Sequence, residues 1–279
     1  MEEENFNDLL TPKNDVVFKR LFGKVGNERL VKDFLEAILD MKIENVILGK
    51  ETQLLPEKVD EKLGILDVRV ELSDGTAIDI EMQKINSGDI EKRFTYYLNR
   101  LYLSGLEKGK SYDTLNKAIV IGILDFDYFN DINEFHTTFK MTEQNNLTKT
   151  LNEEEIHFIE LPKFLRSKFD TDRKLDQWLL FIDFSRKELI EMAKEKNEVI
   201  REAAVEYEYL TGEEDLQRIA SPKDVVQVMT DVFWMDRQIA EMFREHGIAA
   251  AAVSGSMKQS ERKEFQDKFV NREIHVLCA

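Results

Sequence analysis

The spacing of apolar residues along the chain predicts a mixture of helices and strands. Apolar positions recur at the helical period within the segments 13–22, 27–39, 88–106, 175–193 and 198–210. Runs rich in β-branched residues predict strands at 45–54, 65–72, 76–83, 118–124, 135–140 and 156–161. Because 118–124 is apolar throughout, we expect it to be a central strand that is buried on both faces. Helices and strands in this order indicate an α/β fold.

Two of these strands form a predicted hairpin whose faces differ in chemistry. The strands 65–72 and 76–83 flank Ser73-Asp74-Gly75, and a three-residue loop with glycine in the left-handed position is a favoured hairpin geometry. Such a loop pairs Leu72 with Thr76. Strict alternation then places apolar residues on one face and polar residues on the other, among them Asp67, Arg69, Asp79, Glu81 and Gln83.

This register sets Asp67 directly opposite Glu81, with their Cβ atoms roughly 5 Å apart. Two facing carboxylates repel each other unless a cation lies between them, and Mg²⁺ usually takes one or two carboxylates from a protein. The pairing therefore predicts a divalent-cation site. The alternative is a solvated polar face on which Arg69 neutralises Asp79. A two-residue turn would shift the register and remove the pairing.

The hairpin is one of several ordered motifs that together resemble a known family. Asp67, the hairpin, Glu81-Met82-Gln83 and a following helix are arranged as in PD-(D/E)XK nucleases. The fuller set, over about residues 11–210, is similar to the recombination-promoting nuclease (Rpn) family of transposase-like proteins. The other motifs that carry this resemblance are Pro12-Lys13-Asn14-Asp15 with Phe18-Lys19, Gly64-Ile65-Leu66-Asp67-Val68, Arg93 with Tyr96-Tyr97, Gly109 with Tyr112, and Ile159-Glu160-Leu161-Pro162-Lys163-Phe164.

The resemblance implies a restriction-endonuclease-like mixed sheet flanked by helices. It also implies a hydrolase that cleaves phosphodiester bonds in DNA and is linked to recombination or a mobile element. Asp67 and Glu81 would hold Mg²⁺, with Mn²⁺ as an alternative, to activate a water molecule and to stabilise charge on the phosphate. Gln83 occupies the place of the superfamily's usual lysine, so its expected role is to orient the water or the phosphate.

Three further residues are expected to assist at this site. Asp15 lies where the first helix of such folds can supply another acid, and a surface acid at the start of a helix is the alternative. Arg93 and Tyr97 lie on the helix after the hairpin, from which they could approach DNA. Core packing is the alternative for the tyrosine.

The C-terminal stretch departs from the nuclease pattern. It predicts the order βαβαβ, which is typical of a parallel sheet, at 225–230, 236–246, 248–253, 259–270 and 274–278. This stretch resembles the first half of the second motor domain of superfamily 2 helicases. The matching motifs are Phe243-Arg244-Glu245-His246-Gly247-Ile248, Val253-Ser254-Gly255-Ser256, Glu261-Arg262, Phe269 and Ile274-His275-Val276-Leu277.

The predicted organisation is a nuclease domain at 1–212, a linker at 213–222 and a partial RecA-like unit at 223–279. The nucleotide-binding lysine of a first motor domain is not found in the sequence, so we expect no ATP hydrolysis. Whether the last unit is functional or is the remnant of a gene fusion is left open.

Composition bears on location and partners. No apolar run in the sequence is long enough to span a membrane, and the acidic N-terminal residues do not resemble a signal peptide, so we expect a cytoplasmic protein. Cys278 is the only cysteine, which excludes an intramolecular disulfide and a cysteine-based zinc site. The net charge of −16 argues against a general nucleic-acid-binding surface. Contacts to DNA must therefore be local, or a metal ion must offset the acidic charge.

Two functions therefore compete, and a third, a helicase-associated adaptor whose C-terminal stretch docks on a partner motor, rests on the helicase-like fragment alone. The intact pair of Asp67 and Glu81 favours an Mg²⁺-dependent DNA endonuclease. Gln83 and the negative charge favour a catalytically weak or inactive DNA-binding or regulatory module that keeps the nuclease fold. A homodimer is left open by the sequence.

Overall fold

The computed structural model describes residues 10–49, 53–54, 64–65, 67–106, 109–212, 250–252 and 276–278. The chain divides into two compact units, Met1–Gly212 and Glu213–Ala279. Among the residues described, none of the helices is both long and apolar enough to cross a bilayer.

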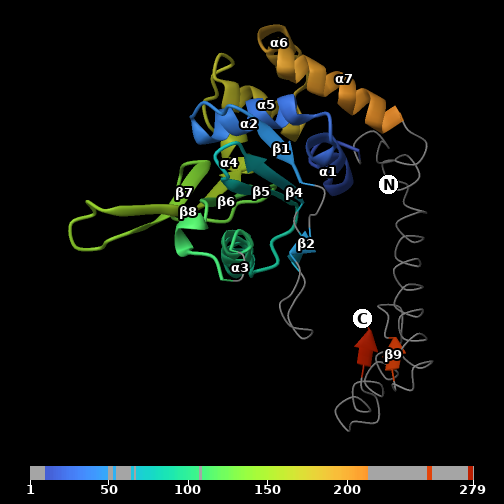
Figure 1. Ribbon diagram of the computed structural model, residues 1–279. Helices are drawn as coiled ribbons and strands as arrows, with labels where there is room; N and C mark the ends of the chain where they lie inside the picture. The colour runs from blue at the N-terminus through green and yellow to red at the C-terminus, as the bar shows by residue number, and fades with distance from the viewer. Residues whose placement is uncertain are drawn as a thin grey trace, which may run out of the picture. The chain divides into compact units, whose positions relative to one another are not determined.

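A six-stranded mixed sheet forms the centre of the first unit (Figure 1). In spatial order its strands are β1 (Val46–Leu48), β4 (Val68–Leu72), β5 (Ala77–Gln83), β6 (Ala118–Leu124), β8 (Thr150–Glu160) and β7 (His136–Thr142). β5, β6 and β8 are parallel, whereas the pairs β1–β4, β4–β5 and β7–β8 are antiparallel. β6 coincides with the predicted strand 118–124 and is buried at every position, which confirms that it is a central strand.

Helices cover both faces of this sheet, and the prediction of a restriction-endonuclease-like α/β fold is confirmed (Figure 1). The helices are α1 (Asp15–Gly23), α2 (Glu28–Leu39), α3 (Ile90–Leu103), α4 (Leu161–Arg166), α5 (Lys174–Asp183), α6 (Lys187–Lys196) and α7 (Glu198–Gly212). α3 packs on one face, against β5, β6 and β8, while α1 and α2 pack on the other. α5 and α7 contact α2 and α1 from outside, so they form a second helical layer.

The sequence of α1 fixes how this helix sits on the sheet. The side chain of Asn14 accepts hydrogen bonds from the backbone N–H groups of Val16 (3.0 Å) and Val17 (3.4 Å) and so caps the first turn. The ring of Phe18 lies 4.7 Å from that of Phe22, which in turn lies 5.8 Å from Trp178 of α5. This buried aromatic cluster leaves little room for α1 to rotate about its axis. The direction of the exposed face of α1 is therefore fixed.

The central hairpin has the register that its loop predicts. Val68 pairs with Ile80 and Val70 with Ile78, and the backbone N–H of Leu72 donates to the carbonyl of Thr76 (2.9 Å). Gly75 has a φ of +86°, and a Cβ there would lie 2.4 Å from the side-chain nitrogen of Asn116. Only glycine satisfies both the turn and this contact.

Several predicted elements have other bounds in the structure. The expected helix 175–193 is two helices, because Phe184 adopts a left-handed conformation (φ 62°) that ends α5. Strand 156–161 ends at Glu160, since Pro162 suits the first turn of the short helix α4. Within the predicted strand 45–54 the described residues form β1 and β2 (Gln53–Leu54), and around the predicted strand 65–72 they form β3 (Gly64–Ile65) and β4.

Two short strands are described in the second unit. β9 (Ala250–Ala252) pairs in parallel with β10 (Val276–Cys278). Both lie within predicted strands, 248–253 and 274–278, and have the predicted relative direction. The predicted linker 213–222, strand 225–230 and helices 236–246 and 259–270 lie outside the described residues. One parallel pair is common to many folds, so the helicase resemblance stays a prediction.

Gly122 is expected to be intolerant of any side chain. A Cβ at this position would lie 2.0 Å from Cε2 of Phe94, which packs over β6 from α3. We expect Gly122→Ala to lower the free energy of unfolding by about 1–3 kcal/mol, measured by urea denaturation, because the core would be overpacked. Gly105→Ala is the control, since its Cβ would make only an ordinary 3.6 Å contact. Equal stability of the two variants would contradict this view of the α3 contact.

Candidate active site

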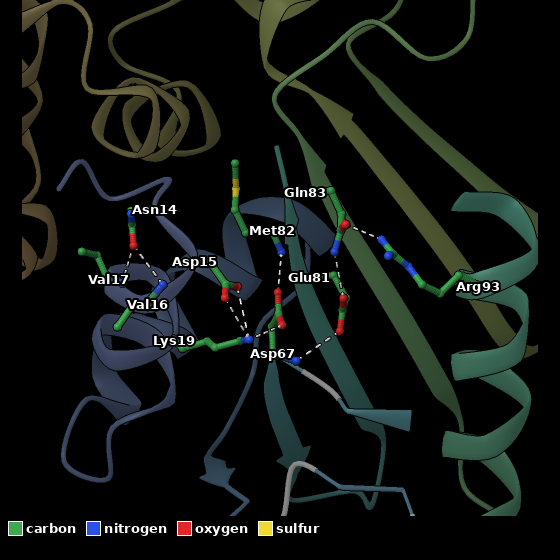
Figure 2. A network of polar contacts seen from close by, with 10 residues as sticks. All are labelled: Asn14, Asp15, Val16, Val17, Lys19, Asp67, Glu81, Met82, Gln83 and Arg93. Carbon is green, nitrogen blue, oxygen red and sulfur yellow. Dashed lines mark hydrogen bonds and ion pairs between the residues drawn. The ribbon is translucent and has the colours of Figure 1, made fainter. Parts of the chain in front are cut away.

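The hairpin carries a pair of interlocked acids at the point where β4 and β5 part. The strand ladder ends at the Val68–Ile80 pair. Beyond it, the backbone N–H of Asp67 donates to Oε1 of Glu81 (3.1 Å), and the backbone N–H of Met82 donates to Oδ2 of Asp67 (3.1 Å) (Figure 2). The two carboxylates therefore face each other across the hairpin, and the backbone sets their separation.

These acids are buried rather than solvated. Asp67 is 9% exposed and Glu81 is 2% exposed, so the alternative of a solvated polar face does not hold at these positions. Glu81 of β5 pairs with Gly122 of β6. Because Gly122 has no side chain, Phe94 of α3 packs directly against it. Burial, together with the nearby carboxylate of Asp67, raises the pKa of Glu81 to about 8.

Asp79 is a third acid of this cluster, and the sequence did not predict its environment. Its side chain is fully buried, and no donor in the described part of the chain reaches either carboxylate oxygen. Burial, with Glu81 and Asp67 nearby, raises the pKa of Asp79 well above its usual range. Arg69 lies opposite Asp79 but donates to Oγ of Ser104 (3.3 Å), so it does not pair with this acid. The buried environment of Asp79 therefore favours the protonated acid.

Gln83 links the acids to α3. Its side-chain nitrogen donates to Oε2 of Glu81 (3.1 Å), while its side-chain oxygen accepts a hydrogen bond from the guanidinium of Arg93 (Figure 2). The amide is thus oriented by a carboxylate on one side and a cation on the other. The sequence placed Gln83 and Arg93 near the site, and the structure brings both to Glu81.

Tyr97 lies one helical turn beyond Arg93 and is partly buried. Burial and the carboxylate of Glu81 raise the pKa of Tyr97 to about 12, so its hydroxyl stays protonated. Both expected α3 residues therefore lie within the electrostatic reach of Glu81, one as a cation and the other as a neutral hydroxyl.

Asp15 is linked to Asp67 through Lys19, for which the sequence predicted no role. Nζ of Lys19 lies 2.9 Å from Oδ1 of Asp67 and 3.2 Å from the carboxylate of Asp15 (Figure 2). Burial alone would lower the pKa of Lys19, but these two carboxylates more than offset it and raise the pKa above its ordinary value. The spacing of Asp15 and Lys19, four residues apart on one helix face, is the signal that could have indicated this pair.

Lys13 anchors the start of α1 near the ends of β5 and β6. Its amine contacts the carboxylates of Asp125 (3.0 Å) and Asp183 (3.2 Å). The backbone N–H of Asp125 donates to the carbonyl of Gln83 (2.9 Å). Asp125 thus ties the start of α1 to the end of β5.

The donor set fits a hard divalent cation in kind. Asp67 and Glu81 offer carboxylate oxygens, and burial raises the pKa of both, so a cation that stabilises their ionised forms would be favoured here. Within the described residues no three acidic, histidine or cysteine side chains form a ready cage for a metal ion. Two carboxylates that leave other positions to water and phosphate are nevertheless what Mg²⁺ commonly uses.

The fold and the site together define a PD-(D/E)XK nuclease architecture. The family model described as PD-(D/E)XK nuclease family transposase matches residues 12–226, and the chain belongs to this family. Comparisons with curated proteins and with solved structures gave no match. The family match spans the helices, the hairpin and β6–β8, and it ends before β9.

The raised pKa of Glu81 predicts a pH-dependent loss of stability in metal-free protein. Because folding favours the protonated acid, stability should fall as pH rises from about 4.5, the ordinary pKa, to about 8. Glu81→Gln should remove about 2–5 kcal/mol of this fall, as measured by urea unfolding in EDTA at several pH values. Glu71→Gln, an exposed site on the same hairpin, is the control. Parallel pH profiles for wild type and Glu81→Gln would contradict the assignment.

Proposed function

We propose that the protein is a metal-dependent DNA endonuclease whose active site is the Asp67–Glu81 pair. The observation that carries this proposal is the pair of reciprocal hydrogen bonds that holds two buried carboxylates face to face. Membership of a nuclease family supports phosphodiester hydrolysis as the chemistry. Its transposase description supports a link to recombination or a mobile element.

Asp67 and Glu81 would hold Mg²⁺, and Mn²⁺ would suit the same oxygen ligands. The bound cation would supply an activated water at neutral pH and would balance charge on the scissile phosphate. The protein's own contribution is to fix the two carboxylates in position, since their backbone hydrogen bonds leave little freedom.

The neighbouring side chains shape the charge around this pair. Gln83 holds Glu81 through its amide nitrogen and can present the amide to water or phosphate when the Arg93 contact opens. Arg93 offers a guanidinium, and Tyr97 a hydroxyl that remains a donor at any working pH. Such contacts are local, as they must be in a chain with a net charge of −16.

The proposed division of labour places nuclease activity in 1–212, with 213–222 as linker and 223–279 as a separate unit without ATPase activity. DNA is the proposed partner and the cytoplasm the proposed location. The second candidate function is a non-catalytic DNA-binding module, which the uncharged Gln83 favours. Cleavage and binding must therefore be measured separately.

The test is cleavage of supercoiled plasmid DNA by the full chain with Mg²⁺, with Mn²⁺ and with EDTA. We expect cleavage with either cation, none in EDTA, and a loss of about 100-fold or more in Asp67→Asn and Glu81→Gln. Glu71→Gln should retain wild-type activity because its carboxylate is exposed and outside the cluster.

DNA binding is followed in parallel by fluorescence anisotropy with Ca²⁺ in place of Mg²⁺. Cleavage that persists both in EDTA and after the Asp67 substitution would rule out the proposed mechanism. Tight binding without cleavage under any condition would instead establish the non-catalytic module.

A further inference from the structure

Lys19 contacts the proposed metal-binding carboxylate, although it lies on a helix far from the hairpin in sequence. Its ammonium is 2.9 Å from Oδ1 of Asp67 (Figure 2). We propose that Lys19 is a catalytic cation that binds the scissile phosphate beside the metal, and so supplies the positive charge that Gln83 cannot. This proposal rests on the proposed nuclease function.

Lys19 joins the buried pair to the protein surface. The side chain of Asp67 is 8% exposed, whereas that of Lys19 is 37% exposed. The Lys19 side chain is therefore partly exposed to solvent, while its ammonium contacts a proposed metal ligand. A DNA phosphate that binds the metal next to Asp67 would meet this ammonium on approach.

The position of Lys19 is fixed by α1, while its ammonium keeps freedom to move. Val17 and Leu21 are buried on the face of the helix opposite Lys19, and Lys13 anchors the start of the helix to Asp125 and Asp183. A lysine side chain is a flexible four-carbon stem that ends in a compact charge. The ammonium could thus move from Asp67 to the phosphate of a bound substrate by side-chain rotation alone.

The other cations near the cluster are committed elsewhere. Arg93 binds the side-chain oxygen of Gln83, on the far side of Glu81 from Asp67 (Figure 2). Arg69 donates to Ser104 of α3. Among these described side chains, Lys19 is the one whose charge lies directly against Asp67.

We expect that removal of the Lys19 charge affects metal binding and cleavage differently. A divalent cation that binds Asp67 competes with the ammonium for the same carboxylate, so loss of the lysine charge should leave metal affinity unchanged or increase it. The same loss should slow cleavage, because the charge on the phosphate is less well balanced. A lysine that only kept Asp67 in place would affect both properties in the same direction.

The experiment compares Lys19→Met, which keeps the stem but loses the charge, with Lys19→Arg, which keeps the charge. Lys24→Met is the matched control, because Lys24 pairs with Glu206 of α7 at the other end of α1. Measured quantities are kcat on plasmid DNA, the Kd for Mg²⁺ by isothermal titration calorimetry, and Tm by circular dichroism.

We expect Lys19→Met to lower kcat by about 100-fold, with a Kd for Mg²⁺ equal to or lower than that of wild type. Lys19→Arg should stay within about tenfold of the wild-type kcat, and Lys24→Met should match wild type. If Lys19→Met does not fold, the kcat of folded Lys19→Arg decides, and a loss beyond tenfold overturns the proposal.

A Lys19→Met kcat within about threefold of wild type, or a joint loss of cleavage and Mg²⁺ binding, also overturns it. An inactive wild-type protein would remove the nuclease function itself, and Lys19's role with it. Active wild type with active Lys19→Met would remove only the role of Lys19.

Discussion

Asp67 and Glu81 are two acidic side chains that the first unit keeps face to face in a buried position. Two backbone N–H groups, each of which donates to the side chain across the hairpin, oppose the repulsion between their ionised forms. These donors belong to the strands themselves, so the spacing of the acids cannot change without disturbing the sheet. The site therefore owes its geometry to the backbone rather than to flexible side chains.

Helices on opposite faces of the sheet each bring a cation close to this pair. α1 brings the ammonium of Lys19 to Asp67, and α3 brings the guanidinium of Arg93 to Gln83. α3 also excludes water, because Phe94 packs directly over Gly122 beside Glu81. Charge arranged in advance in a site shielded from water is more effective than the same charge in solution. Such an arrangement suits a protein whose overall charge repels DNA.

The parts of the site that depend on local geometry followed from the sequence. Gly75 and the loop length determine the register, and the register places Asp67 opposite Glu81. The burial of Asp79 did not follow, because it depends on how α3 packs over β6. The contact of Lys19 with Asp67 depends on the rotation of α1, which distant aromatic residues fix. The break at Phe184 was missed because composition rarely signals a left-handed residue that is not glycine.

The raised pKa of Glu81 makes divalent-cation binding an exchange reaction. Because this pKa lies at about 8, a cation that binds the carboxylate of Glu81 at neutral pH displaces a proton to the solvent. Metal occupancy would then rise with pH, and the heat of binding would depend on the buffer that takes up the proton. Under the proposed function, the activity of the nuclease would therefore depend jointly on pH and on the concentration of free Mg²⁺.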